Sequence, residues 1–290
     1  MDLLRSRLAA AGLTDVESVL AAERGAVAVA GVVRRGDGTQ VFAKTLAGDG
    51  SDVFAVEAEG LRALRDQGGA ATPAVVLVTP VLLVLEPLRP IPAGPAFWER
   101  LGRMIATLHT TTAGTRFGWH RDGWLGQLRQ ENAWRDDGHA FFAERRVLRW
   151  LAEPPVRAAF DDADRRALEH LCARLPELVP AQPPVLTHGD LWSGNVLADE
   201  RGGPVLIDPA TSYTWGEVDL SMLWCSPRPP EADRFFAVYE EIARPHDGWR
   251  DRMPLLHLRE LLSVVGHGHD DWGAADEIRA IVKPFRRTLP

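Results

Sequence analysis

Apolar residues are spaced as in β-strands over the first third of the chain and as in α-helices over most of the remainder. Strands show alternation or short apolar runs, separated by clusters of Gly, Pro and Asp. On this basis, strands are predicted at 27–33, 40–44, 73–78 and 81–85. The segment 52–66 predicts a helix instead, because Phe54, Leu61 and Leu64 recur near one helical face.

Helical spacing dominates the later part of the chain. Helices are predicted at 2–11, 97–109, 139–151, 161–175, 230–243, 254–265 and 274–282. The segment 184–219 interrupts this pattern, because short strands at 195–198 and 204–208 flank a Gly202-Gly203 turn.

A proline-rich segment separates the two patterns and predicts a hinge at 87–95. The expected fold class is therefore α+β with two lobes. A small β-rich N-terminal lobe at 1–86 binds nucleotide, and a larger, mostly helical lobe at 96–290 holds the catalytic and acceptor-binding residues.

Composition and charge exclude several classes of protein. The chain has 290 residues, 46% hydrophobic and 25% charged, which is ordinary for a globular protein. Its net charge of −7 disfavours a nucleic-acid partner, and its two cysteines give no disulfide framework. The longest apolar run, 75–85, is too short to cross a bilayer, and the N-terminus lacks a signal-peptide pattern. We expect a monomeric cytoplasmic protein without membrane contacts.

The segment His188-Gly189-Asp190-Leu191-Trp192-Ser193-Gly194-Asn195 carries the strongest chemical signal. It is followed by a strand, a turn, a second strand and Asp208, which is the layout of phosphotransfer enzymes. In that layout, Asp190 accepts the proton of an attacking hydroxyl. Asn195 and Asp208 supply oxygen ligands to Mg²⁺, and ATP is the phosphoryl donor.

Lysine is scarce in this chain, since Lys44 and Lys283 are its only lysines. Lys44 lies on a predicted strand and fits the lysine that contacts ATP phosphates. Its expected partner is a glutamate on the following helix, either Glu57 or Glu59. Glu57 is favoured, because it shares the inward face with Leu61 and Leu64.

Other positions complete the predicted site. Glu86 and Leu88 are expected to meet adenine through their main-chain groups, and Gly25 is the single glycine of a weak phosphate loop. The remaining expectations are acceptor binding by Trp192, Trp215 and Glu217, and support of the catalytic loop by His188 and Asp219.

The chain resembles the fructosamine kinase (ketosamine-3-kinase) family of the aminoglycoside phosphotransferase and choline kinase superfamily, which has a protein-kinase-like fold. The resemblance rests on the 188–195 motif with Trp192, on Asp208-Pro209-Ala210, on Glu217-Val218-Asp219 and on Phe117-Gly118-Trp119. It implies Mg-ATP-dependent phosphorylation of the sugar 3-hydroxyl of ketoamines, such as ribulosamine or fructosamine adducts of proteins or small amines.

The acceptor side departs from the family pattern at Gly138, Thr214-Trp215-Gly216 and Ser263-Val264, and these departures favour a small sugar such as ribulosamine or erythrulosamine. Two alternatives stay open at this point. One is a kinase for an aminoglycoside, amino sugar or choline-like alcohol, and the other is a nucleotide-binding protein without catalysis.

Overall fold

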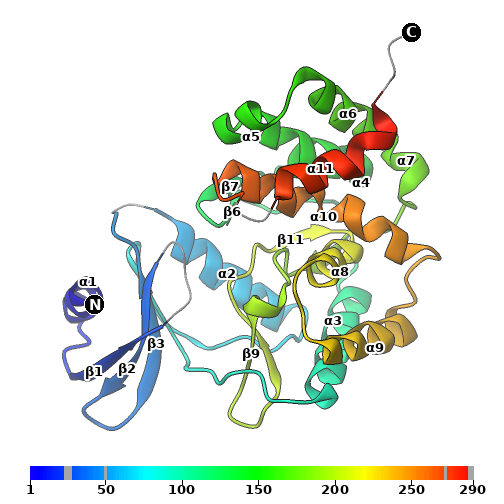
Figure 1. The fold of residues 1–290 in the computed structure, drawn as a ribbon. Coiled ribbons are helices and arrows are strands. Elements are labelled where there is room, and N and C mark those ends of the chain that lie inside the picture. The colour runs from blue at the N-terminus through cyan, green and yellow to red at the C-terminus, as the bar shows by residue number, and fades with distance from the viewer. Residues whose placement is uncertain (23–27, 49–50, 271–272, 287–290) are drawn as a thin grey trace.

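The computed structural model describes residues 1–22, 28–48, 51–270 and 273–286 (Figure 1). A five-stranded antiparallel sheet with strand order β1-β2-β3-β5-β4 forms the core of the N-terminal lobe. Its strands are β1 (Val16–Ala21), β2 (Val29–Arg35), β3 (Gln40–Thr45), β4 (Val75–Val78) and β5 (Leu82–Leu85). The lobe also contains the helices α1 (Asp2–Ala10) and α2 (Val53–Asp66).

Alternation along β5 explains how this sheet buries both faces. Leu82 and Val84 pack with Leu4 and Leu8 of α1, in a cluster that covers one face. Their neighbours Leu83 and Leu85 pack on the opposite face, with residues of α2 such as Leu61. Figure 1 shows α1 outside the sheet and α2 between the sheet and the helical lobe. The helix that carries Glu57 is thus held where the two lobes meet.

The C-terminal lobe is built from helices around a large apolar core (Figure 1). Its longer helices are α3 (Pro95–Thr111), α6 (Asp162–Ala173), α8 (Gly216–Cys225), α9 (Asp233–Ala243), α10 (Trp249–Gly266) and α11 (Ala274–Val282), and the shorter ones are α4 (Gly138–Phe142), α5 (Pro154–Ala159) and α7 (Leu175–Leu178). Within the described ranges, no helix is both long and apolar enough to span a bilayer.

Small two-stranded sheets bring the polar segments of this lobe together. They pair β6 (Gly123–Leu125) with β7 (Leu128–Gln130), β8 (Val185–Thr187) with β11 (Ser212–Thr214), and β9 (Val196–Ala198) with β10 (Pro204–Leu206). The sequence predicted β9 and β10, which flank the Gly202-Gly203 turn, but not the other two pairs. A main-chain bridge between Arg89 and Ala198 joins the proline-rich segment to β9.

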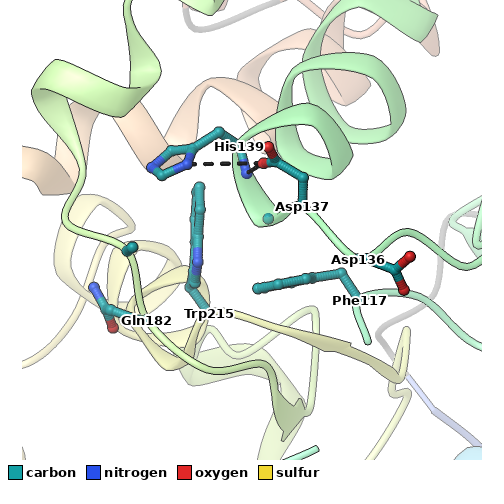
Figure 2. Close-up of a pocket in the computed structure, with 8 residues that line it drawn as sticks. Phe117, Asp136, Asp137, His139, Gln182 and Trp215 are labelled. Atoms are coloured by element: carbon teal, nitrogen blue, oxygen red, sulfur yellow. Dashed lines mark hydrogen bonds and ion pairs between the residues drawn. The ribbon is translucent and has the colours of Figure 1, made fainter. Parts of the chain in front are cut away.

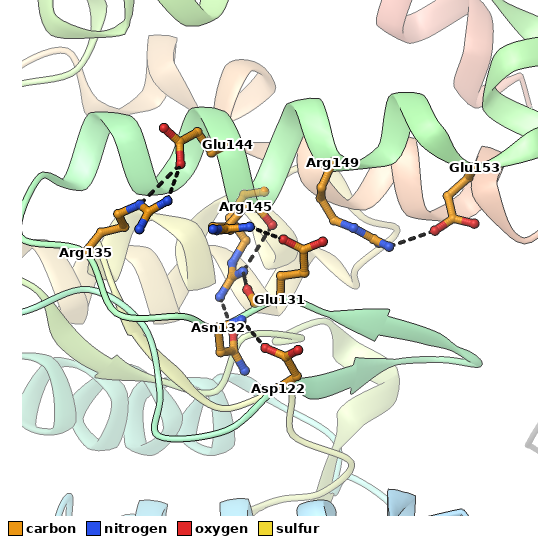
Figure 3. A network of polar contacts seen from close by, with 9 residues as sticks. Asp122, Glu131, Asn132, Arg135, Glu144, Arg145, Arg149 and Glu153 are labelled. Carbon is orange, nitrogen blue, oxygen red and sulfur yellow. Dashed lines mark hydrogen bonds and ion pairs between the residues drawn. The ribbon is translucent and has the colours of Figure 1, made fainter.

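The helix predicted at 139–151 is only partly α-helical. After α4 the chain forms a π-helical turn, Ala143–Val147, and then a 3₁₀ segment, Leu148–Ala152. The π turn carries two consecutive arginines that reach one loop (Figure 3): Arg145 pairs with the carboxylate of Glu131, and Arg146 donates to Asn132 Oδ1 at 2.7 Å. A π-helical turn lowers the angle between successive side chains, and here both arginines face the same loop.

The segment that contains Gly118 crosses the main chain of β11 at Tyr213. The N–H and carbonyl of Gly118 both bond to the main chain of Tyr213, each at 2.9 Å. Its φ of +124° is disfavoured for any other residue, and a Cβ would lie 2.5 Å from the carbonyl oxygen of Asn132. The Phe117-Gly118-Trp119 sequence is therefore explained by a close main-chain crossing.

We predict that Gly118→Ala lowers the free energy of unfolding by about 1–3 kcal/mol, the scale of a strained backbone conformation. Urea denaturation followed by tryptophan fluorescence measures this. The matched control is Gly48→Ala, because no atom of the described residues beyond its chain neighbours lies within 4 Å of a hypothetical Cβ, and its φ is not positive. Equal denaturation midpoints for the two variants would contradict the crossing argument.

Candidate active site

The predicted catalytic loop follows β8 directly. Asp190 Oδ2 accepts a hydrogen bond from Asn195 Nδ2 at 2.6 Å, and the same Nδ2 donates to the Asp190 carbonyl oxygen at 2.9 Å. The 3₁₀ turn Ser193–Asn195 makes this return contact across five residues possible. Asp190 therefore has a fixed orientation, with Asn195 beside it.

Asp219, at the start of α8, supports this loop from beneath. Its two carboxylate oxygens accept the N–H groups of His188 and Gly189, each at 2.8 Å. His109 Nε2 lies 3.2 Å from Asp219 Oδ2, and His109 Nδ1 lies 2.9 Å from the hydroxyl of Tyr239. Burial raises the pKa of Asp219, but these donors outweigh it and the net direction is downward, so the carboxylate stays ionised.

His188 connects the catalytic loop with the segment after β10. Its Nε2–H donates to the Ile207 carbonyl at 2.9 Å, and its Nδ1 accepts from Asp190 N–H at 3.2 Å. Burial lowers the pKa of His188, which agrees with this neutral tautomer. Gly189 crosses Ala210 so closely, at a φ of +80°, that a Cβ would lie 2.2 Å from the Ala210 carbonyl oxygen.

Lys44, Glu57 and Asp208 meet at the boundary of the lobes. Lys44 Nζ lies 2.7 Å from Glu57 Oε2 and 2.5 Å from Asp208 Oδ1. Burial lowers the pKa of Lys44, but the two carboxylates outweigh it, so the net pKa is raised and the ammonium stays charged. The sheet, α2 and the catalytic lobe thus each contribute one member of this cluster.

The structure places Glu57, and not Glu59, against Lys44, as the helix-face argument expected. Glu59 instead accepts from Trp119 Nε1 at 2.8 Å and lies 2.9 Å from His120 Nε2. Asp52, just before α2, accepts from Trp124 Nε1 at 2.8 Å. These contacts fix α2 to the segment before β7, with Glu57 turned inward.

Asn195 and Asp208 fit a magnesium ion. Both carry hard oxygen donors, and Mg²⁺ usually needs only one or two protein ligands beside water and phosphate. The side chain of Asp208 is half exposed, and its residue has a φ of +52°, which turns it out of the line of β10. The hydrogen bonds of Asn195 Nδ2 leave its Oδ1 available.

Sequence reasoning missed two charged residues of α10 that act on Asp190, Arg259 and Glu260. The pKa of Asp190 is raised well above its usual value, first by burial and then by the charge of Glu260, while Arg259 acts in the opposite direction. The available signal was a charged pair inside the mostly apolar segment 255–265.

Trp192 has the exposure that an acceptor wall needs, since it is 40% exposed. Its indole lies over Gly194, where a Cβ would meet the ring at 2.2 Å. Its role in acceptor binding stays a prediction.

Glu217 was expected to bind the acceptor but is buried inside the C-terminal lobe. It is 2% exposed, and its two oxygens accept from Arg252 Nε at 2.8 Å and Arg252 Nη2 at 2.6 Å. The charge is neutralised inside the lobe, so Glu217 is not available to a cationic acceptor. The expectation failed because Arg252 is a partner distant in sequence.

Trp215 is likewise enclosed, at 1% exposure. Its ring stacks on Phe142 at 5.5 Å and meets Phe117 edge-on at 6.0 Å. Figure 2 shows it beside His139 and Phe117 at a pocket of about 430 Å³. Thr214, which precedes it, pairs with Val185, whereas the catalytic loop begins after the opposite end of β8. Trp215 is therefore a packing residue away from Asp190, and its expected acceptor role is corrected.

The expected adenine contacts lie after β5. Glu86 N–H donates to the Ala74 carbonyl at 2.9 Å, and its side chain accepts from Ala74 N–H at 3.2 Å. Over the described ranges, the N–H of Leu88 has no hydrogen-bond partner, so it is free to meet a ligand. Gly25 lies outside the described residues.

Comparisons with known proteins agree with this arrangement. A Synechocystis protein assigned as a ketoamine kinase is 34% identical over 220 residues, 73% of this chain and 72% of its own. The chloroplastic protein-ribulosamine 3-kinase of Oryza sativa subsp. japonica is 28% identical over 245 residues, 80% of this chain and 70% of its own.

A solved structure from Thermobifida fusca, assigned as a fructosamine-3-kinase, superimposes with a TM-score of 0.86 at 31% identity, covering 98% of this chain and 99% of that one. The two-lobed protein-kinase-like fold predicted from the sequence is confirmed. The family model described as fructosamine kinase matches residues 8–274. The chain therefore belongs to the fructosamine kinase family.

Proposed function

We propose that this protein is an ATP-dependent kinase that phosphorylates the sugar 3-hydroxyl of ketoamines. The observation that carries this is the meeting of Lys44, Glu57 and Asp208 beside an Asp190–Asn195 pair. Family membership supports the ketoamine class of acceptor. In this proposal, 1–86 binds nucleotide, 87–95 forms the hinge and 96–290 binds the acceptor.

Asp190 is the group that receives the proton. The acceptor oxygen forms a bond to the γ-phosphorus of ATP, the bond from that phosphorus to the bridging oxygen breaks, and ADP leaves. The hydroxyl proton passes to Asp190, which Asn195 holds in place. Lys44 neutralises phosphate charge, and Glu57 keeps it in position. When bound between Asn195 and Asp208, Mg²⁺ supplies further charge neutralisation on the phosphates.

The acceptor is proposed to be a small ketoamine, ribulosamine or erythrulosamine, carried by lysine or by a low-molecular-weight amine. The rice relative is named for ribulosamine, and the exposed Trp192 offers a wall beside Asp190. We further propose a monomer that acts in the cytoplasm. Both cysteines, Cys172 and Cys225, are free thiols, which suits a reducing compartment.

We predict that Asp190→Asn reduces turnover by about 10²-fold or more, the scale of general-base loss, while ATP affinity stays near that of the parent. Steady-state assays with ribulosyl-lysine measure turnover, and calorimetry measures nucleotide binding. Nearly intact turnover would show that another group receives the proton.

Asp208→Ala is expected to weaken Mg²⁺-dependent nucleotide binding much more than it weakens folding, because its carboxylate is half exposed. ATP titrations at several Mg²⁺ concentrations, with thermal unfolding in parallel, test this. An unchanged Mg²⁺ dependence would remove Asp208 from the metal site.

Lys44→Arg is expected to lose most activity despite keeping the charge, because a planar guanidinium does not fit the compact space between Glu57 and Asp208. Glu57→Gln is expected to lose activity as well, since Lys44 is then held less firmly. Glu59→Gln is the matched control on the same helix: it keeps an oxygen acceptor for Trp119 and should be mild. Similar losses in the two glutamine variants would contradict the assignment of Glu57.

A further inference from the structure

Asp52 immediately precedes α2, yet its carboxylate does not cap that helix. An aspartate in this position usually accepts the N–H groups of the first helical turn. Asp161 does so before α6, and Asp137 does so before α4. The side chain of Asp52 therefore serves something other than the local stabilisation of its own helix.

Three side chains of the C-terminal lobe converge on Asp52. Its Oδ2 accepts from Arg121 Nη2 at 2.5 Å, and its Oδ1 accepts from Trp124 Nε1 at 2.8 Å. Arg129 Nη2 lies 3.1 Å from the same Oδ1, and the Arg129 guanidinium carbon lies 4.1 Å from the centroid of the Trp124 ring. Figure 1 shows the β6–β7 hairpin, which carries Trp124 and Arg129, beside the N-terminal end of α2. This end of α2 is thus attached to the other lobe by charge and hydrogen bonds.

A second contact attaches the middle of α2 to the same lobe. A Cβ at Gly60 would lie 2.9 Å from Thr211 Oγ1 and 3.1 Å from Pro209 Cγ, so the helix directly touches the segment that follows β10. This contact comes after Glu57 in the helix, whereas Asp52 comes before it. Glu57 is therefore held between two points of attachment to the C-terminal lobe.

The β6–β7 hairpin is in turn tied to the catalytic loop. Gln130, next to Arg129 on β7, donates through Nε2 to the Ala210 carbonyl at 3.0 Å. Ala210 N–H donates to the His188 carbonyl at 2.9 Å, two residues before Asp190. A series of direct contacts thus runs from the start of α2 to the catalytic loop.

We propose that Asp52 is a positioning residue for phosphoryl transfer, which holds Glu57, and through it Lys44, at a fixed place relative to Asp190. This inference rests on the proposed function and adds to it a residue that acts only through others. Transfer requires the phosphates beside Lys44 to be aligned with the hydroxyl beside Asp190, and small displacements between reacting groups lower the rate. Because Lys44 and Asp190 belong to different lobes, a polar contact between the lobes affects that alignment.

The test is a double-mutant cycle of Asp52→Ala and Glu57→Gln, assayed with ribulosyl-lysine and Mg-ATP at enzyme concentrations high enough to follow low residual rates. In the parent, Asp52→Ala should lower kcat by about fivefold or more, while KM for ribulosyl-lysine changes by less than about twofold. In the Glu57→Gln background, the same substitution should change kcat by less than about twofold, because Lys44 has already lost the contact through which Asp52 acts.

Thermal unfolding, measured in parallel, should change little in Asp52→Ala. The side chain caps no N–H group of α2, and the partly exposed Arg121 and Arg129 can be solvated once their partner is removed. The matched control is Asp15→Ala, because Asp15 belongs to the same lobe and is 40% exposed, against 32% for Asp52. Asp15 pairs with Arg35 within that lobe, at 2.9 Å, so its loss should leave kcat unchanged.

Unchanged kcat in Asp52→Ala, or an equal fold-loss in both backgrounds, would overturn the positioning role and leave the proposed function standing. A parent that does not phosphorylate ribulosyl-lysine would instead contradict the proposed function itself. If Asp52→Ala does not fold, Arg121→Gln removes a contact of Asp52 from the side of the C-terminal lobe and takes its place in the same cycle.

Discussion

The carboxylate of Asp219 is the interaction on which the position of the catalytic loop depends. A fully buried carboxylate is strongly unfavourable unless donors surround it. Here the donors are two main-chain N–H groups of the loop itself, together with His109 of α3. Because His109 also contacts Tyr239 of α9, the packing of α3, α8 and α9 determines where Asp190 lies. The packing of the C-terminal lobe thus sets the position of Asp190 through the buried carboxylate of Asp219.

A second constraint is the balance of charge between the lobes. Lys44 is shared by Glu57 and Asp208, which satisfies a buried ammonium. Under the proposed function, Lys44 would hold the phosphates of ATP and Asp208 would hold the metal, which would change this balance. Glu57 is fixed by the contacts of α2 with the segment before β7, so it can keep Lys44 in place through that exchange.

The sequence was most informative where local periodicity or a compact motif determines the geometry. The choice of Glu57 over Glu59 follows from helical spacing, and the 188–195 motif gave the Asp190–Asn195 contact. It was least informative where the environment of a side chain depends on a partner that is distant in the sequence. From the sequence alone, Glu217 is interpreted as an exposed acid. In the structure, Arg252, which lies 35 residues later, forms a hydrogen bond with it. The π turn after α4 depends in the same way on contacts with another segment.

The scarcity of lysine becomes understandable from the buried cations. Arg146 and Arg252 are both buried, and each spreads its donors over several partners or over both oxygens of one carboxylate. A planar guanidinium can satisfy such divided contacts, whereas an ammonium presents its charge at a single point. Lys44 is the position that requires a point charge, because Glu57 and Asp208 converge on one atom. The residue choice therefore follows the shape of each buried site rather than its charge alone.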